Sequence, residues 1–599
     1  MRLSPRARKW FKRILWTFVS LIVLLFLVVY FLFLLPFWGM PFNGQRHTRV
    51  PITPEWALEC WLWEDDHNTA EFVDELLEGY REHDIPVRTI VLDSPWSTRY
   101  NDFIVDEDRY PKPEEWFRGK QEEGYRIVLW MTNMVDSQSK DTKIQDSSDW
   151  FREASEKGYL AGGDYQVRWW KGRGGFIDYT NPEAMKWWRG LQQNVFDWGI
   201  DGWKLDGAAT FFSSMLGKVP IPYQKTHRGW MTTRKYMDHY YRDEYEHGLT
   251  QNPEFVTLAR SIDRPFTHPE GFAPFDAAPV TWVGDQRHTW KSGEVHDESD
   301  PGKGDLVREG DEGIEEALRD ILHAADLGYC VIGSDVAGFS GSEIPPRLYI
   351  RWAQFSTFCG LFLNGGHGER RLWKRSEQEM EIIRRFSWLH TELVPYMYSL
   401  VVACHNGGPP LMRPVEGDYH YLFGDSFLVA PIYRDSLERE VHLPAGEWRY
   451  FFDDREVIEG PTKLTREYPL EEFPVYVREG SIVPMDVKRA YTGIGDASSE
   501  NYLTLNLYPD TESPSTFEFH SEESAGPGLI EMKANDASID IAVTGIPKPH
   551  ILRVRVDREP KRIRLNGEDL VSGWNYNSDN SRVIVRSEDN RSAEYRIDF

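Results

Sequence analysis

The chain has 599 residues and a formal net charge of −26 at pH 7, and 14% of its residues are aromatic. This length accommodates two to four domains with sizeable hydrophobic cores. The first 13 residues carry six Arg or Lys and no acid, so the remaining residues carry −32, six units more negative than the whole chain. Such an acidic body would repel the phosphates of a nucleic acid, and we therefore exclude nucleic-acid binding as the function.

An apolar segment without charged side chains follows the basic N-terminus at residues 14–35. As a helix rising 1.5 Å per residue it would span about 33 Å, enough to cross the hydrocarbon core of a bilayer. A cleaved signal peptide is the alternative, but its apolar region is usually shorter, and no Ala-x-Ala site follows this segment. We predict a basic cytoplasmic tail, a transmembrane anchor, a linker and an extracytoplasmic catalytic domain, with the first three at residues 1–13, 14–36 and 37–52.

From residue 53, apolar segments alternate with amphipathic helices or loops. The amphipathic segment 68–84 is predicted to be a helix with Asn68 or Thr69 near its N-cap, and further helices are expected at 181–199, 313–328 and 346–358. Eight segments are predicted to be strands: 55–63, 87–93, 125–132, 201–206, 254–261, 279–285, 328–335 and 360–366. Eight βα units predict an α/β fold, a (β/α)8 TIM barrel over residues 53–407. A doubly wound sheet is the alternative, but no Gly-x-Gly-x-x-Gly sequence follows the first strand.

The pattern changes near residue 408 to short alternating strands separated by turn residues. It predicts two β-sandwich domains after the barrel, a proximal one at residues 408–488 and a distal one at residues 489–599. The four cysteines lie far apart in apolar surroundings, and their spacing suits neither a metal site nor a dense disulfide framework; they are Cys60, Cys330, Cys359 and Cys404. We predict buried thiols, with a single disulfide as the alternative in an exported domain.

Four predicted barrel strands end in an aspartate, and one ends in an arginine followed by serine. Any one such aspartate could be a helix N-cap, but the C-terminal ends of barrel strands are where barrel enzymes have their active sites. These strand-end residues are Asp93, Asp206, Arg260, Asp285 and Asp335. Together they predict an active site at this end of the barrel.

The strand 201–206, "DGWKLD", separates its two aspartates by position. Because side chains alternate, Lys204 and Asp206 share the face opposite Trp203. Asp201 precedes the strand at its N-terminal end and is predicted to be a turn residue, which leaves Asp206 as the catalytic candidate. Two carboxylates at one barrel mouth can cleave a glycosidic bond, one as nucleophile and one as general acid/base.

The second carboxylate that we consider is Asp285, in "TWVGDQ". Its aromatic neighbours would raise its pKa, as a general acid requires. Lys204 or Arg260 would supply the cation that keeps Asp206 ionised.

Ordered motifs between residues 55 and 486 resemble family 31 of the glycoside hydrolases, which are retaining α-glycosidases. Those in the barrel are "VLDSPW", "DFIVDEDRYPKP", "GFIDYTNPEAMKWW", "DGWKLDG", "LARS", "TWVGDQ", "IGSDVAGFSG" and "RWAQFSTFCGLFLNGGHGERRLW". "LFGDSFLVAPI", "LPAGEWRYFFD" and "FPVYVREGSIVPM" are similar to the first C-terminal module of the family.

The resemblance implies a double displacement with Asp206 as the nucleophile and Asp285 as the general acid/base. Asp93 would bind distal hydroxyls of the sugar, and the chemistry requires no metal or cofactor. The substrate would be a carbohydrate, an oligosaccharide or glycoconjugate. The resemblance implies that the pocket is completed by Trp170, Arg260, Trp282, Asp335 and His367.

Three features depart from the family pattern. The β-sandwich that usually precedes the barrel is replaced by the apolar segment and linker. The sequence "GAATFF" after Asp206 lacks the usual Glu, and "LNGGH" before His367 lacks the Arg common in α-glucosidases. We therefore expect an exo-acting α-glycosidase whose sugar is left open among glucose, galactose, xylose and an anionic sugar.

Two alternatives accompany this expectation. Lys204 either reads an anionic group of the sugar or forms an ion pair with Asp206 or Asp93. The competing function is a catalytically weak or inactive member that binds glycans or acts like a chaperone, because a fold alone does not imply an activity.

Overall fold

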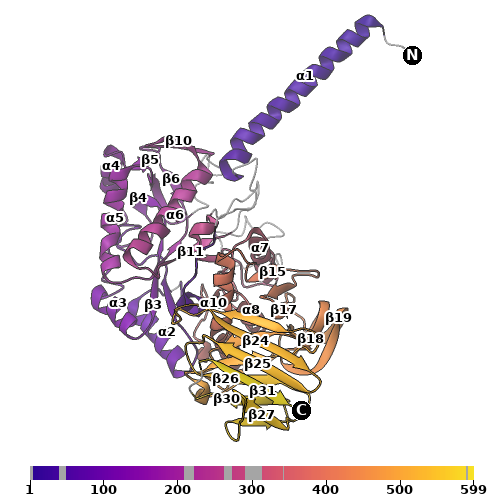
Figure 1. The fold of residues 1–599 in the computed structure, drawn as a ribbon. Coiled ribbons are helices and arrows are strands. Elements are labelled where there is room, and N and C mark those ends of the chain that lie inside the picture. The colour runs from indigo at the N-terminus through magenta and orange to yellow at the C-terminus, as the bar shows by residue number, and fades with distance from the viewer. Residues whose placement is uncertain are drawn as a thin grey trace.

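The computed structural model describes residues 4–38, 49–65, 67–207, 222–261, 273–290, 313–341, 343–588 and 591–599. A long helix, α1 (Pro5–Val29), continues as the π-helical segment η1 (Tyr30–Trp38) and projects away from the rest of the chain (Figure 1). Within the described part of the chain, Arg8–Pro36 is the one helix both long and apolar enough to cross a membrane. Length and composition suit a membrane span and a signal sequence alike.

Eight parallel strands form the central sheet in the same order as in the sequence. A bridge between Asp335 and Leu363 joins the last two strands and closes the sheet, so the predicted TIM barrel is confirmed. The strands are β1 (Cys60–Leu62), β2 (Thr89–Leu92), β3 (Arg126–Met131), β8 (Gly202–Leu205), β11 (Val256–Arg260), β12 (Val280–Trp282), β13 (Ile332–Gly333) and β14 (Phe362–Asn364). The first is shorter than predicted, because residues 55–58 form the 3-10 turn η2 (Glu55–Leu58) after Pro54.

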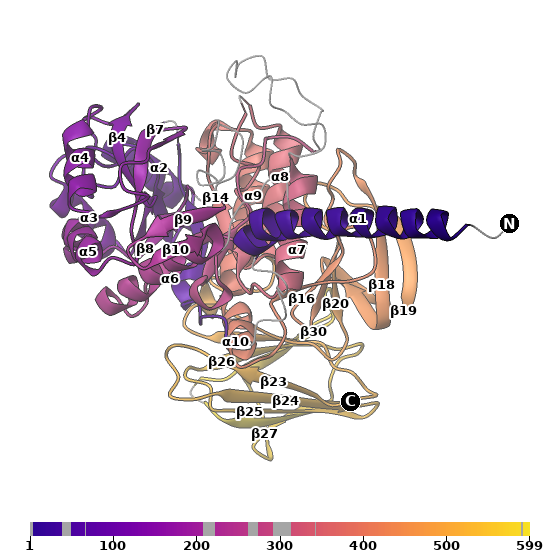
Figure 2. The same cartoon turned by 90° about the horizontal axis from the view of Figure 1, so that it is seen from above.

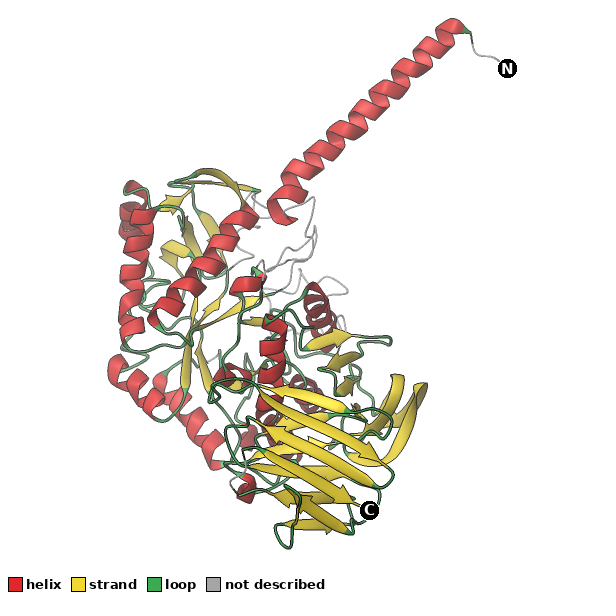
Figure 3. Cartoon of the chain, viewed as in Figure 1, coloured by secondary structure: helices red, strands yellow, loops and turns green. Residues whose placement is uncertain are grey.

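Helices follow most of these strands on the outside of the barrel (Figure 3). They are α2 (Ala70–Glu82), α3 (Pro113–Glu122), α5 (Pro182–Asp197), α6 (Thr233–Gln251), α7 (Ile314–Leu327), α8 (Pro346–Thr357), α9 (Glu377–Glu392) and α10 (Val394–His405). The Thr69 side chain caps α2 by accepting from the backbone N–H of Phe72, and Asn181 caps α5 in the same way ahead of Pro182. Between β11 and β12 the described residues contain the 3-10 turn η4 (Phe275–Ala277).

Two insertions extend the connections that follow barrel strands β3 and β8. The connection after β3 contains α4 (Ser148–Glu156) and a small antiparallel sheet made of β4 (Met134–Ser139), β5 (Leu160–Ala161), β6 (Val167–Trp169) and β7 (Gly172–Ile177). The connection after β8 contains the hairpin of β9 (Tyr223–Thr226) and β10 (Gly229–Thr232). Figure 2 shows this hairpin beside the base of α1.

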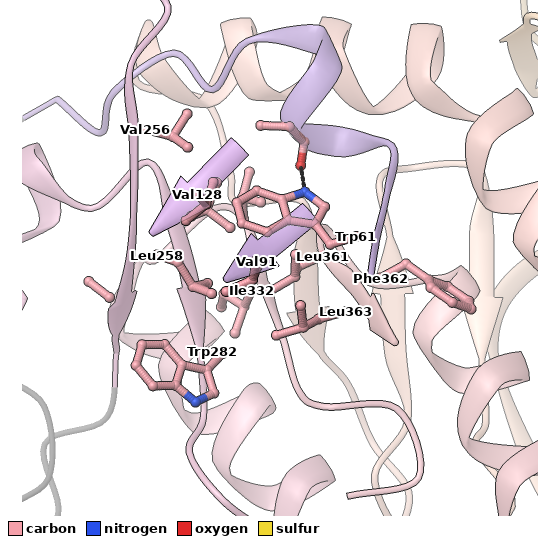
Figure 4. Close-up of a cluster of buried hydrophobic side chains, with 14 of the residues drawn as sticks. Trp61, Val91, Val128, Val256, Leu258, Trp282, Ile332, Leu361, Phe362 and Leu363 are labelled. Carbon is pink, nitrogen blue, oxygen red and sulfur yellow. Dashed lines mark hydrogen bonds between the residues drawn. The ribbon is translucent and has the colours of Figure 1, made fainter. Parts of the chain in front are cut away.

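Apolar side chains from the strands fill the inside of the barrel (Figure 4). Val91, Val128, Leu258 and Ile332 meet there and are almost completely buried. The near-continuous apolar runs that predicted the strands reflect this burial on both faces of a parallel sheet. All four cysteines are buried and free.

Two β domains follow the barrel. The proximal domain has one six-stranded sheet that buries one face against the barrel helices, and its strands are β15 (Met412–Pro414), β16 (Tyr421–Phe423), β17 (Phe427–Val429), β18 (Glu438–Tyr450), β19 (Asp453–Glu467) and β20 (Val475–Arg478). The distal domain packs two sheets around a core of its own. Its strands are β21 (Ile482–Met485), β22 (Leu503–Leu507), β23 (Ser515–Phe519), β24 (Gly528–Asn535), β25 (Ser538–Thr544), β26 (His550–Arg555), β27 (Arg562–Leu565), β28 (Glu568–Asp569), β29 (Trp574–Asn577), β30 (Arg582–Arg586) and β31 (Ala593–Asp598). Because β21 pairs with β22, the sheets divide near residue 480, before the predicted boundary at 488.

Candidate active site

A cavity of about 540 Å³ lies at the C-terminal ends of the barrel strands. Seven of the nine predicted site residues line it: Asp93, Trp170, Lys204, Asp206, Arg260, Asp285 and His367. Its volume is within the usual range for small-molecule sites. The barrel thus brings together residues that lie up to 274 positions apart, counted from Asp93 to His367.

Asp206 is held in one orientation at the end of β8. Its carboxylate accepts hydrogen bonds from Trp130 Nε1 at 3.1 Å and from the backbone N–H of Gly207 at 2.8 Å. Its backbone is fixed too, since Asp206 N donates to Met131 O at 3.0 Å and Tyr240 donates to Asp206 O at 2.9 Å. The side chain is 14% exposed, so one edge of the carboxylate faces the cavity.

Arg260, at the end of β11, lies between the two proposed catalytic carboxylates. Its Nε is 3.4 Å from Asp206 Oδ1, and another nitrogen of the same guanidinium donates to Asp285 Oδ2 at 2.6 Å. A single rigid guanidinium therefore sets the relative position of the two carboxylates. Asp285 is the more open of the two, with its side chain 42% exposed against 14% for Asp206.

Lys204 pairs with Asp93 and not with Asp206. Its Nζ donates to Asp93 Oδ2 at 2.6 Å, and both side chains are almost completely buried on the cavity wall. The ammonium also lies 3.8 Å from the centre of the Trp63 ring, a close cation–π contact. Burial alone would lower the pKa of Lys204, but the carboxylates of Asp93, Asp335 and Asp206 outweigh it and raise the pKa.

Two predicted pocket residues, Trp282 and Asp335, do not line the cavity but lie beneath it. Trp282 is completely buried in the barrel core, as Figure 4 shows, with the Arg260 guanidinium 4.9 Å and the Lys204 ammonium 5.5 Å from its ring. Asp335 is 1% exposed and accepts a hydrogen bond from Trp63 Nε1 at 3.2 Å. Both side chains lie inside the barrel. Trp282 contacts the cavity residues Arg260 and Lys204, and Asp335 interacts electrostatically with Lys204.

Burial raises the pKa of Asp335 to about 7; Lys204 opposes this shift and Asp285 adds to it. The folded chain therefore keeps a proton that the unfolded chain releases near pH 4. Stability from this group is complete below pH 4 and is lost as the pH rises to about 7.

Replacing Asp335 with Asn, which does not titrate, should remove this pH dependence. Relative to the variant, the parent chain is expected to lose roughly 4 kcal/mol or less between pH 4 and pH 7. Thermal unfolding midpoints of both proteins at unit steps of pH would measure the change. Parallel curves would show that Asp335 is ionised throughout.

Tryptophans at strand ends are functional neighbours that the sequence patterns did not single out. Trp130 on β3 lies in register with Lys204 on β8 and donates to the Asp206 carboxylate. Trp63, just after β1, contacts both Lys204 and Asp335. Their positions at the C-terminal ends of strands could have indicated that they lie near the site. A tryptophan at such a position is, however, also a common core residue.

An acidic partner for His367 was also missed. Asp65 Oδ2 is 3.0 Å from His367 Nε2. Asp65 follows β1 and His367 follows β14, and both side chains line the cavity. Trp170 and Lys171, which follow β6 in the inserted sheet, form another part of the wall. The sequence "GAATFF" begins at Gly207, and its residues 208–212 lie outside the described residues.

Asp201 has a structural role, as its position before β8 predicts. Its carboxylate accepts hydrogen bonds from Arg126 at 2.8 Å and from the backbone N–H of Ile127 at 2.9 Å. These contacts tie the N-terminal ends of β8 and β3 together, at the opposite end of the barrel from the cavity. Among the described residues, no group of three or more His, Cys, Asp or Glu is arranged to hold a metal ion.

Two family models match the chain. The glycosyl hydrolases family 31 TIM-barrel domain matches residues 50–296 and 303–400, and the family 31 C-terminal domain matches residues 395–483. These matches cover more than half of the chain, and they confirm the resemblance that the motifs indicated.

Similar proteins agree with these family models. Alpha-glucosidase 2 of Bacillus thermoamyloliquefaciens is 24% identical over 79% of this chain, and an alpha-xylosidase of Emericella nidulans is 25% identical over 74%. The alignments cover 58% and 54% of those two proteins, so the chain spans little more than half of their length. A family 31 dextranase of Flavobacterium johnsoniae, solved with isomaltotriose, has a similar fold, with a TM-score of 0.74 at 20% identity over 92% of this chain and 71% of the dextranase.

Proposed function

Because the chain belongs to family 31 of the glycosyl hydrolases, we propose that it is an exo-acting α-glycosidase that cleaves terminal α-linked sugars with retention. The observation that carries this proposal is the placement of Asp206 and Asp285 on either side of the Arg260 guanidinium in one cavity. Two carboxylates so placed can divide the roles of nucleophile and general acid/base.

Asp206 is the nucleophile in this proposal. Its oriented carboxylate attacks the anomeric carbon and forms a β-linked glycosyl-enzyme, while the glycosidic oxygen leaves. Asp285, the more exposed carboxylate, protonates the leaving oxygen and then takes a proton from the water that hydrolyses the intermediate. Arg260 contacts both carboxylates and holds them in place while Asp206 loses its negative charge on forming the glycosyl-enzyme and Asp285 gains one on giving up its proton.

The polar end of the cavity supports an exo mode of action. Asp93, Lys204, Asp65 and His367 form a cluster of hydrogen-bonding groups in the cavity wall, where they would bind the hydroxyls of a terminal sugar. Because Asp93 neutralises Lys204 and the wall carries four carboxylates, we favour a neutral sugar over an anionic one.

Hydrolysis of a panel of aryl α-glycosides tests the proposal. We expect activity on at least one neutral sugar among glucose, galactose and xylose, and lower activity on carboxylated or sulfonated analogues. NMR of the early products should show the α-anomer first, because two inversions retain configuration. Release of the β-anomer first would refute retention, and a preference for anionic sugars would mean that Lys204 reads the substrate.

Binding of glycans without turnover on the whole panel would instead support the inactive, glycan-binding alternative.

We also propose that Arg8–Pro36 remains in the mature chain as a membrane anchor. The six basic residues at positions 2–13 would stay in the cytoplasm and place the catalytic domain on the other side.

A further inference from the structure

The hairpin β9–β10 carries an unusual surface for so acidic a protein. Residues 225–235, "KTHRGWMTTRK", contain four Arg or Lys and no acidic residue. Trp230, at 72% exposure, is the most exposed aromatic side chain in the described part of the chain. Neither feature belongs to the cavity of the proposed active site.

Strand pairing explains which side chains face outward. Trp230 on β10 is directly opposite Lys225 on β9, and both are exposed. The next pair, Met231 and Gln224, is buried beneath the hairpin. The outer face therefore combines an indole with cationic side chains at its edges, the combination typical of the boundary between membrane and water.

The hairpin is attached to the apolar helix inside its membrane-spanning range. Tyr223 at the start of β9 donates a hydrogen bond to the backbone carbonyl of Phe31 at 2.8 Å, and Phe31 lies five residues before the end of the span at Pro36. At the α-helical rise five residues would span about 7 Å, and the π-helical segment η1 that contains them is no longer than that. The headgroup layer on each side of the hydrocarbon core is about as thick as that, so a helix that spans the bilayer brings this hairpin to headgroup level. Figures 1 and 2 agree that the hairpin lies beside the base of α1.

We propose that the outer face of the β9–β10 hairpin, formed by Lys225, Arg228, Trp230 and Lys235, binds anionic lipid headgroups around the anchor. The proposal rests on the membrane anchor proposed above. Within the part of the chain that the structure describes, no carboxylate pairs with the three cationic side chains, all exposed. Trp230 inserts at the interface while these side chains contact phosphates.

This contact also orients the catalytic face. The hairpin belongs to the connection that follows the strand of Asp206, and Lys225 O accepts a hydrogen bond from Gly162 N at 2.7 Å in the inserted sheet. The same sheet carries Trp170 and Lys171 on the cavity wall. Seating the hairpin on the bilayer holds the cavity close to the membrane surface, where it meets glycans presented there.

Fluorescence quenching on the full-length chain in lipid nanodiscs tests the proposal. A fluorophore is placed at Trp230→Cys, at Val571→Cys as an exposed control in the distal domain, or at Val23→Cys within the anchor; the native cysteines are buried. With spin-labelled headgroups in discs containing phosphatidylglycerol, we expect quenching at position 230 and none at position 571. Position 23 lies near the middle of the span Arg8–Pro36, so it is read in discs with spin-labelled acyl chains, where we expect quenching.

Charge is tested with the triple variant K225Q/R228Q/K235Q. Each cationic side chain near an anionic surface is worth about a five-fold change in binding, so the triple variant should shift the docked-to-undocked ratio by roughly 100-fold. Discs made only of neutral lipids should lower the docked-to-undocked ratio of the parent chain by a similar factor. The matched control, K463Q/K533Q/K561Q in the C-terminal domains, removes the same charge from exposed positions and should leave quenching at position 230 unchanged.

The outcomes separate the two proposals. Lipid quenching at position 23 without quenching at position 230 overturns the hairpin contact and leaves the anchor intact. Absence of quenching at both positions means that the anchor itself is wrong, and the hairpin contact fails with it. Equal quenching at position 230 in neutral and anionic discs rules out recognition of anionic headgroups.

Discussion

Replacing Asp206 with Asn is expected to lower kcat on the preferred aryl α-glycoside by roughly 10⁴-fold or more. The amide has almost the same volume and can still accept the hydrogen bond from Trp130 Nε1, so the site should keep its shape. It cannot, however, act as the nucleophile that forms the glycosyl-enzyme. Steady-state rates, with circular dichroism as a check on folding, measure the effect.

Asp201, which lies at the opposite end of β8 from Asp206, offers a matched control. Asp201→Asn removes one negative charge from the ion pair with Arg126 at the far end of the barrel, so it should lower the unfolding temperature and leave kcat within a few-fold of the parent. As a second readout, azide added to Asp206→Gly should yield a β-glycosyl azide, because the small anion attacks from the vacated side. Equal losses of kcat in the two asparagine variants would remove Asp206 from the mechanism.

The second large effect is expected at Asp285. Asp285→Asn removes the proton donor, so kcat/KM should fall by about 10²- to 10⁴-fold for substrates with poor leaving groups. Aryl substrates with acidic phenols need little protonation and should lose much less in the first step. A series of leaving groups of different pKa therefore gives a steeper dependence in the variant than in the parent.

Azide provides the complementary check for Asp285→Asn. It needs no general base, so it should accelerate turnover of the glycosyl-enzyme and release an α-glycosyl azide, the opposite anomer to that expected from Asp206→Gly. A uniform loss across all leaving groups, without rescue by azide, would assign Asp285 a binding role. The acid/base would then have to be sought elsewhere in the cavity.

Much of the barrel was predictable because its signal is local. Parallel strands buried on both faces read as apolar runs, and the eight runs were found in the right order. The alternation along the strand 201–206 correctly separated Asp206 from Asp201 and placed Lys204 on the same face as Asp206. Of the nine site residues predicted, seven share the cavity wall, although their chemical roles stay predictions.

What local patterns could not predict was the contact between strands. Lys204 could have paired with Asp206, two residues away in its own strand, or with Asp93 from β2, and the closed barrel selects Asp93. Trp282 and Asp335 end up beneath the cavity because their depth depends on how each strand is staggered against its neighbours. The Asp65–His367 pair forms because β1 and β14 are adjacent across the closure of the barrel.

By itself, then, the sequence determined the eight-strand order, the apolar N-terminal helix, the family and the strand-end carboxylates. Each of these can be inferred from the residue types and their spacing within one segment of the chain. Only the tertiary structure decided which cation meets which carboxylate, which tryptophans support them, and that a basic hairpin lies against the apolar helix. Those contacts depend on barrel closure and strand stagger, which join residues far apart in the chain and leave no periodicity in the sequence.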